Sequence, residues 1–268
     1  MFVGREAERD RLRGRLARVA AYGEMMGPLT IVTGPRGVGK TSLLRDVADR
    51  AAADAGVFLN AVQNMAAEKD GFPLGVIGAG LPQTKAWLTQ AATFGERTHE
   101  ITLGKLDERD SRALLTEPAR LAGAAWSGDA LTLALARGDG YPQSLQIIGS
   151  AVWDAAAPQA GAEIAPRHVE AAEQAIQEDL ESMFRARWEA SSAAERLFLA
   201  AMAWHGTEPV PRAAVASRLG VPSDSLGVAR RALIAKGVVE AARHGELKFT
   251  VPGFGAFVRS QRADPSDP

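Results

Sequence analysis

The sequence predicts an α/β protein with a reduced parallel sheet at its N-terminal end, followed by a long helical region. A glycine-rich loop of pattern G-x-x-x-x-G-K-T, Gly34–Thr41, follows the apolar run Leu29–Val32 and precedes the helix-like run Ser42–Arg50. The short apolar run Leu74–Ile77 and the stretch His99–Leu103 are two further strand candidates. A strand, a glycine-rich loop and a helix in this order begin a parallel α/β unit.

Helical periodicity accounts for most of the other elements. Glu6–Ala21 forms an amphipathic pattern before the first strand, and one helical phase runs from the loop to Met65. After the third strand, glycine and proline breaks separate further helices. These are predicted at about 108–122, 128–137, 142–157, 166–190, 192–204, 211–219 and 224–236, followed by strand-like runs at Val238–Ala241 and Leu247–Val251.

The composition is that of a soluble globular protein. Hydrophobic residues make up 46% of the 268 residues and charged residues 24%, and no apolar run is long enough to span a membrane. The absence of cysteine excludes disulfides and thiolate metal sites, and it favours a cytoplasmic protein. Residues 182–262 carry twelve Lys/Arg against six Asp/Glu, which indicates an anionic partner for the C-terminal region.

The glycine-rich loop predicts a nucleotide-phosphate site. Its glycines allow backbone N–H groups to surround an anion, and the following helix directs its positive end at the same point. Lys40 is placed to reach the β- and γ-phosphates, and the Thr41 hydroxyl to bind Mg²⁺. The predicted phosphate-binding residues are Gly34, Pro35, Arg36, Gly37, Val38, Gly39, Lys40, Thr41 and Ser42.

Motifs elsewhere extend this prediction to a family. The box Phe2-Val3-Gly4-Arg5-Glu6, the stretch 103–108 and Gly140-Tyr141-Pro142 together resemble the STAND and origin-recognition-like branch of AAA+ ATPases. Residues 192–262 resemble the winged-helix domain that follows the helical lid in such proteins. The resemblance implies a P-loop NTPase core at 1–104, a lid at 105–190, a winged helix at 191–262 and a tail at 263–268.

The same resemblance implies the ligand and further site residues. It implies ATP or ADP with Mg²⁺, with Val3, Gly4 and Arg5 beside the adenine end and Pro142 near the base. It also places a trans-acting arginine in the neighbourhood of Arg97, although a surface arginine in a loop is the commoner explanation for that residue.

One family element is missing between the loop and Gly78. The family pattern requires a strand of apolar residues that ends in Asp, the Walker B segment, to order Mg²⁺ and the attacking water. The nearest match, Val57–Asn60, ends in an amide and fits a helix better. The second strand and the acidic strand therefore both look removed, either in a natural shortened paralogue or through an incomplete gene model.

Three functions remain open from the sequence. The chain is a nucleotide-hydrolysing switch that uses Lys40 and Thr41, a nucleotide-binding module with little hydrolysis, or a DNA-binding regulator with a residual nucleotide site. For double-stranded DNA, the predicted contacts are basic residues of the recognition helix and wing. They are Arg230, Arg231, Lys236, Arg243 and Lys248. A protein partner or self-association is a further expectation, and packing of the winged helix against the lid is the alternative to DNA contact.

Overall fold

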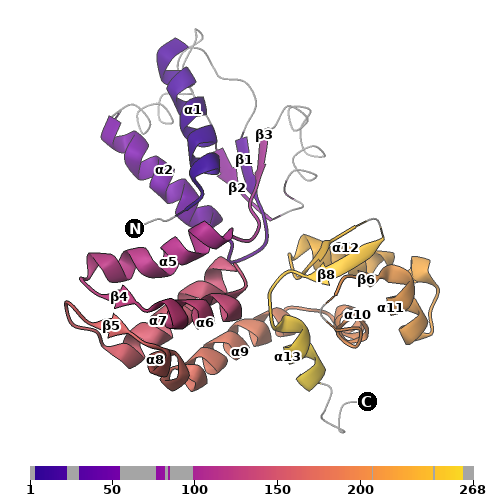
Figure 1. Cartoon of the computed structure of the whole chain (residues 1–268). Coiled ribbons are helices and arrows are strands. Elements are labelled where there is room, and N and C mark those ends of the chain that lie inside the picture. Colours follow the sequence, from indigo (N-terminus) through magenta and orange to yellow (C-terminus); the bar gives the residue numbers. More distant parts are fainter. Residues whose placement is uncertain are drawn as a thin grey trace. The chain divides into compact units, whose positions relative to one another are not determined.

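The computed structural model divides the chain into two compact units, residues 1–110 and 111–268 (Figure 1). It describes residues 4–22, 30–54, 77–81, 84, 99–206, 208–243 and 245–261. Each unit has its own core and is described by itself. No helix in these described ranges is long and apolar enough to cross a membrane.

The first unit is built on a three-stranded parallel sheet. Strand β1 (Thr30–Thr33) lies in the middle, between β2 (Ile77–Ala79) and β3 (His99–Thr102). All four residues of β1 are buried, with Ile31 and Val32 nearly inaccessible to solvent. A β1 strand paired on both sides is a fixed support for the loop that follows it.

Two helices pack beside this sheet. Helix α1 (Glu6–Tyr22) contacts α2 (Lys40–Asp54), which begins at the end of the glycine-rich loop (Figure 1). The contact combines buried apolar side chains, Leu12 and Leu43, with an ion pair between Arg9 Nε and Asp46 Oδ2 at 3.0 Å. The periodicity of the sequence predicted both helices.

The second strand overlaps its prediction at Ile77. The described strand covers Ile77–Ala79 and continues two residues past the predicted end, through Gly78, which pairs with Ile31. Residues 74–76 of the predicted strand lie outside the described residues. The predicted continuation of α2 to Met65, and the segment 55–76 in which the acidic strand was sought, lie outside the described residues.

The second unit begins with a bundle of lid helices. Its helices are α5 (Glu108–Leu121), α6 (Gly128–Gly138), α7 (Pro142–Ala156), α8 (Pro166–Ala171) and α9 (Glu173–Glu189), and α5 starts within the first unit. Two short parallel strands, β4 (Ala125–Trp126) and β5 (Glu163–Ile164), join its loops. The single helix predicted at 166–190 is two helices, because the last turn of α8 closes at Ala172, whose N–H is shared between two carbonyls.

The C-terminal part has the element order of a winged helix. The order is α10 (Ala193–Ala203), β6 (Val210–Pro211), α11 (Arg212–Leu219), the 3₁₀ turn η2 (Ser223–Leu226), α12 (Gly227–Ala235), β7 (Val239–Ala241), β8 (Glu246–Phe249) and α13 (Phe254–Gln261). The three strands form an antiparallel sheet in the order β6-β8-β7. Helix α12 begins three residues later than the predicted start at about 224, because Ser223–Leu226 forms the 3₁₀ turn η2.

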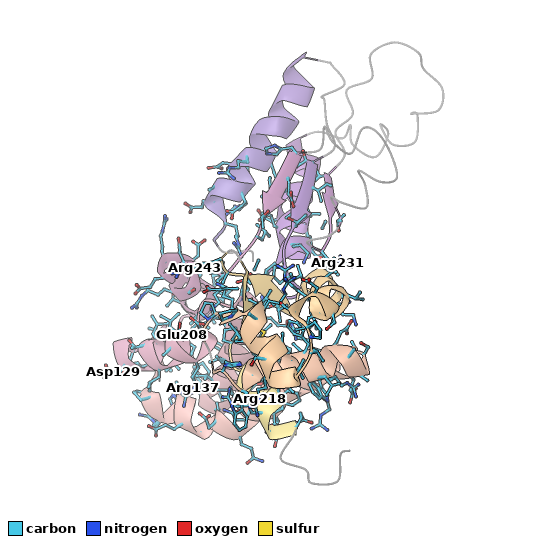
Figure 2. The ribbon with its side chains drawn as sticks, turned by 90° about the vertical axis from the view of Figure 1, so that its right-hand side faces the viewer. Asp129, Arg137, Glu208, Arg218, Arg231 and Arg243 are labelled. Atoms are coloured by element: carbon cyan, nitrogen blue, oxygen red, sulfur yellow. The ribbon has the colours of Figure 1, made fainter. Side chains whose placement is uncertain are left out.

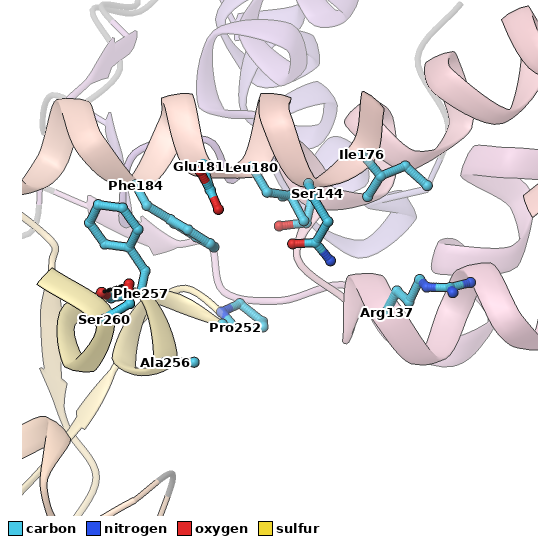
Figure 3. Close-up of a pocket in the computed structure, with 12 residues that line it drawn as sticks. Arg137, Ser144, Ile176, Leu180, Glu181, Phe184, Pro252, Ala256, Phe257 and Ser260 are labelled. Atoms are coloured by element: carbon cyan, nitrogen blue, oxygen red, sulfur yellow. Dashed lines mark hydrogen bonds between the residues drawn. The ribbon is translucent and has the colours of Figure 1, made fainter. Parts of the chain in front are cut away.

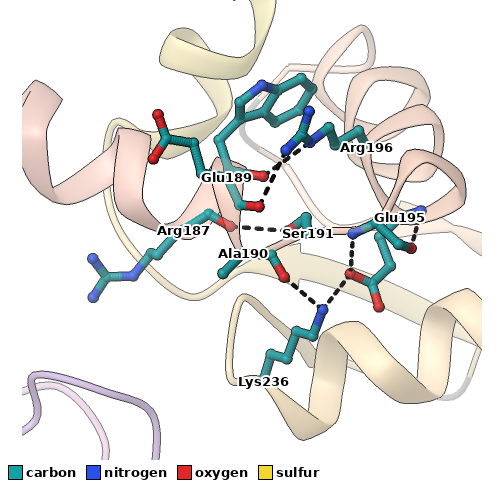
Figure 4. A network of polar contacts seen from close by, with 9 residues as sticks. Arg187, Glu189, Ala190, Ser191, Glu195, Arg196 and Lys236 are labelled. Atoms are coloured by element: carbon teal, nitrogen blue, oxygen red, sulfur yellow. Dashed lines mark hydrogen bonds and ion pairs between the residues drawn. The ribbon is translucent and has the colours of Figure 1, made fainter.

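The lid and the winged helix belong to one compact unit. Phe184 of α9 lies 5.7 Å, between ring centroids, from both Phe254 and Phe257 of α13. Nearby, the ammonium of Lys236 bonds to the carbonyl of Ala190 at 2.8 Å and to the buried carboxylate of Glu195 at 2.6 Å (Figure 4). Apolar and ionic contacts therefore join the two regions that the sequence separated at residue 190.

Helix α13 was not predicted from the sequence, although Phe254, Phe257 and Val258 have helical spacing and are buried. Trp204, at the end of α10, is 65% exposed, and the guanidinium carbon of Arg218 lies 3.7 Å from the centroid of its ring.

Candidate functional site

The glycine-rich loop connects the end of β1 to the first turn of α2 and has a backbone that only glycine tolerates well. Gly34 has φ 148°, and a Cβ there would lie 2.3 Å from the carbonyl oxygen of Leu103. Gly37 and Gly39 also have positive φ, 81° and 86°. The loop is therefore a tight turn at the carboxyl edge of the sheet, where the N-terminus of α2 points into it.

The lysine of the motif lies inside this loop. Lys40 Nζ donates hydrogen bonds to the carbonyl oxygens of Gly34 at 2.8 Å and Pro35 at 2.7 Å. Burial lowers the pKa of Lys40, and the positive charge of Arg36 lowers it further. An anion in the loop would compete with the two carbonyl oxygens for the ammonium protons of Lys40. Its negative charge would also raise the pKa of Lys40 again, because it stabilises the charged form.

Thr41 and Ser42, the next residues, are exposed at the start of α2. Within the described part of the chain, the Thr41 hydroxyl has no hydrogen-bond partner. It stands at the positive end of a 15-residue helix, beside the lysine. A hydroxyl, an ammonium and the N–H groups of a helix start suit a phosphate with an accompanying Mg²⁺ ion.

Arg5 of the N-terminal box holds the loop from the side. Its guanidinium donates to the carbonyl of Gly104, at 2.5 Å, and to that of Val38 within the loop, at 3.3 Å. Its backbone N–H bonds to Asp110 Oδ2 at 2.8 Å, and a Cβ on the preceding Gly4 would collide with the same carboxylate. Of the residues predicted from the box, Arg5 thus contacts the loop and Gly4 lies against Asp110, whereas Val3 lies outside the described residues.

The structure adds one acidic side chain that sequence reasoning missed. Thr33, which immediately precedes the loop, donates its hydroxyl proton to Glu100 Oε1 of β3 at 2.7 Å. Glu100 lies after Gly78 in the sequence, whereas the family pattern places the acidic strand before Gly78. In the sequence, Glu100 is the acidic residue of the strand candidate His99–Leu103.

In the part of the chain that the structure describes, no cluster of His or carboxylate side chains forms a metal site of its own.

Pro142 and the turn before it belong to the second unit. Pro142 is the first residue of α7, and the preceding Tyr141 is fully buried. Burial raises the pKa of Tyr141, while the adjacent Arg187, through its charge and a hydrogen bond, acts in the opposite direction. Arg187 also donates to the side-chain oxygen of Gln143 at 3.2 Å, so α9 fixes the turn in which Pro142 lies.

The five basic residues predicted to contact DNA have different environments. Lys236 is engaged by Glu195 and Ala190, and Lys248 pairs with Glu240 at 3.0 Å across the β7–β8 ladder. Arg230, Arg231 and Arg243 form no hydrogen bond or ion pair with other described residues. Figure 2 shows Arg231 and Arg243 on the winged-helix portion of the second unit.

The comparison with protein families decides the classification. A family model for an AAA ATPase domain matches residues 1–219. The chain belongs to this AAA ATPase family. A second model, for a domain of unknown function, matches residues 181–258, and no curated protein sequence matches the chain. Membership in the family supports nucleotide binding of the ATPase type.

Solved structures show the same fold at low sequence identity. The Walker-type ATPase PABY2304 of Pyrococcus abyssi aligns with a TM-score of 0.66 and 14% identity, covering 96% of each chain. The Aeropyrum pernix ORC2 protein, solved in ADPNP–ADP complexes, aligns at 0.61 and 14%, over 97% of this chain and 94% of that one. The Thermotoga maritima RuvB branch migration motor aligns at 0.51 and 17%, over 92% of each chain.

Proposed function

We propose that this chain is a nucleotide-dependent switch that binds ATP with Mg²⁺ in the Gly34–Ser42 loop and hydrolyses it slowly. The observation that carries the proposal is the loop itself. Three glycines with positive φ turn the backbone toward the start of α2, and the ammonium of Lys40 lies within the turn. The positive helix end, the ammonium and the free hydroxyl of Thr41 are all suited to a polyphosphate.

Adenine is the proposed base because of family membership and because a structure similar to this chain was solved with adenine nucleotides. Arg5 anchors the N-terminal box to Val38, which brings Gly4 and Arg5 to the side of the loop. We place Pro142 against the base, as the G-x-P motif suggests. The second unit would then respond to whether a nucleotide is present, since Pro142 begins one of its helices.

We infer slow hydrolysis because, among the described residues, the strand before the loop is hydrogen-bonded to one carboxylate, that of Glu100. Phosphoryl transfer depends on charge neutralisation by a metal and on an oriented water, which an acidic strand normally assists. Glu100 is the carboxylate that the described structure bonds to the loop strand, through Thr33. We propose that Glu100 helps to orient the attacking water through its hydrogen bond with Thr33, without itself binding the nucleotide.

Calorimetric titration with ATP and Mg²⁺ tests the binding step. The unmodified chain is expected to bind, and Lys40→Ala to weaken binding about tenfold or more, because an ionic hydrogen bond to phosphate is lost. Lys248→Ala, which removes a lysine from a surface ion pair in the other unit, is the matched control and leaves the affinity unchanged. Failure of the unmodified chain to bind ATP would contradict the proposal.

Phosphate release measured on the same samples tests the second step. Glu100→Gln keeps a hydrogen-bond acceptor for Thr33, so we expect it to retain ATP affinity but to release less phosphate. Glu117→Gln, on the exposed surface of α5, is the control. If Glu100→Gln turns over ATP at the rate of the unmodified chain, Glu100 has no part in hydrolysis.

A second function, contact with double-stranded DNA, is supported by the unpaired arginines of the winged helix. Arg230 and Arg231 lie on α12 and Arg243 on the turn between β7 and β8, the positions from which a winged helix meets a duplex. Replacing Arg230 and Arg231 together by Ala should weaken duplex binding and reduce its salt dependence. Arg167→Ala on α8 is the matched control, and equal binding by all three proteins would exclude this function.

A further inference from the structure

A cavity of about 390 Å³ lies within the second unit, between the lid helices and α13 (Figure 3). At ~30 Å³ per water molecule it has room for about a dozen non-hydrogen atoms. Its apolar wall consists of Ile176, Leu180 and Phe184 from α9 and Phe257 from α13. Because Ala256 and Ser260, which also line it, are exposed, the cavity opens to solvent along α13.

The polar side of the cavity has hydrogen-bonding groups without partners. Ser144 is 1% exposed, and its hydroxyl has no hydrogen-bond partner. Arg137 uses Nη2 to bond to Glu173 at 2.5 Å, but its Nη1 is buried and unpaired. Buried donors without partners are costly, so two that line one cavity indicate a ligand that accepts hydrogen bonds.

The start of helix α7 adds to this side of the cavity. Ser144 is the third residue of this 15-residue helix, and the N-cap residue Tyr141 gives no side-chain cap to its free N–H groups. An uncapped helix start favours negative charge. An unpaired guanidinium nitrogen, an unpaired hydroxyl and a helix N-terminus thus meet at the end of the cavity opposite its aromatic wall.

We propose that this cavity binds a small amphipathic monocarboxylate, with the carboxylate at Ser144 and Arg137 and the apolar body against Leu180, Phe184 and Phe257. A multiply charged anion does not fit, because the one cationic group that lines the cavity, Arg137, is already paired with Glu173 and has one nitrogen left to donate, and because Glu181 also lines the cavity. A ligand held here contacts α9 and α13 at once. It would therefore strengthen the joint between the lid and the winged helix, independently of the nucleotide loop.

Octanoate is the probe, titrated into the full chain and followed by calorimetry and by thermal unfolding. Octanoate is expected to bind at least about tenfold more tightly than octanamide, which lacks the charge, or acetate, which lacks the apolar body. It is also expected to raise the midpoint of thermal unfolding by mass action. Equal binding of octanoate and octanamide, or of octanoate and inorganic phosphate, would overturn the proposal.

Variants assign the site within the structure. Arg137→Met should weaken octanoate about tenfold, while Arg120→Met, which removes an exposed arginine of α5, should not. Ala256→Leu fills the open side of the cavity without removing a polar group and should abolish binding. Glu181→Gln removes a negative charge from the lining and should tighten binding about twofold to threefold. Unchanged affinity in Ala256→Leu would show that the ligand binds elsewhere.

Ser144→Ala separates a ligand-binding role from a structural one. A serine that supports the fold loses a contact when it is replaced, so the unliganded variant would be less stable. A buried hydroxyl without a partner costs stability, so Ser144→Ala should raise the unfolding midpoint of the free protein and still weaken octanoate several-fold. Lys40→Ala should bind octanoate normally, which distinguishes this site from the nucleotide loop.

Discussion

Replacing Arg5 by Ala should loosen the nucleotide loop as well as destabilise the first unit. Arg5 is 7% exposed and donates from Nη2 to the carbonyls of Gly104 and Val38. Hydrogen bonds from a charged donor contribute ~1.5–3 kcal/mol each. The 2.5 Å bond to Gly104 belongs at the upper end of that range and the 3.3 Å bond to Val38 well below it. The exposed carbonyl of Gly104 can bond to water instead, so we expect a loss of about 3 kcal/mol and no more.

Urea unfolding measures the stability of each variant, and titration with ATP in the absence of urea measures its affinity. Since Val38 is part of the loop, we expect Arg5→Ala to weaken ATP about tenfold, which corresponds to ~1.4 kcal/mol. Arg5→Lys, which keeps the charge but not the planar fork, should recover part of both losses. Arg109→Ala is the control, because Arg109 is 78% exposed and pairs with Glu6 at 3.5 Å, a contact that contributes ~0.5 kcal/mol.

If Arg5→Ala unfolds at the same urea concentration as Arg109→Ala, the guanidinium of Arg5 does not stabilise the first unit more than an exposed arginine does. If Arg5→Ala is less stable but binds ATP with unchanged affinity, the guanidinium supports the fold without ordering the loop. Arg5 has a positive φ of 61°. Because both Arg and Ala carry a Cβ, the substitution leaves the backbone strain at this position nearly unchanged, and the loss of stability reports on the guanidinium.

Three further changes probe the loop and the second unit. Gly34→Ala should abolish ATP binding and destabilise the first unit by about 3 kcal/mol or more, because its Cβ would meet Leu103 at 2.3 Å; urea unfolding and calorimetry measure both. ATP affinity should fall as the pH rises through the pKa of Lys40, which lies below its ordinary value of 10.5, because only the ammonium form binds phosphate. ATP titrations from about pH 7 to 10 should therefore show this fall at a lower pH than an unperturbed lysine would give. Arg36→Ala should move the fall in affinity to higher pH, because it removes a positive charge that lowers the pKa of Lys40. Lys236→Met should lower the stability of the second unit by about 2–3 kcal/mol in thermal unfolding, since it leaves the carboxylate of Glu195, 7% exposed, with Ser192 as its remaining partner; Lys248→Met, at an exposed pair, is the control.

Local sequence patterns predicted the elements that carry the loop. The run around Ile31 is apolar and short, and Gly34, Gly39, Lys40 and Thr41 have the spacing that a phosphate loop requires, so their roles could be inferred without tertiary information. The helix boundaries of the second unit were likewise close to those predicted, because glycine or proline breaks lie near most of them.

Long-range contacts could not be predicted in the same way. The bond from Arg5 to Gly104 joins residues that lie 99 positions apart, and nothing local marks Glu100 as a partner of Thr33. The cavity beside Ser144 was also invisible, since an unsatisfied hydroxyl is a property of the packed helices and not of the serine.

The contacts of Lys236 have a consequence for motion within the second unit. Lys236 follows the last residue of α12 and is bonded to the carbonyl of Ala190, at the end of α9, and to Glu195, the capping glutamate of α10 (Figure 4). Because these two bonds connect α12 to both α9 and α10, a rotation of α9 would also displace α12 and the arginines that it carries, Arg230 and Arg231.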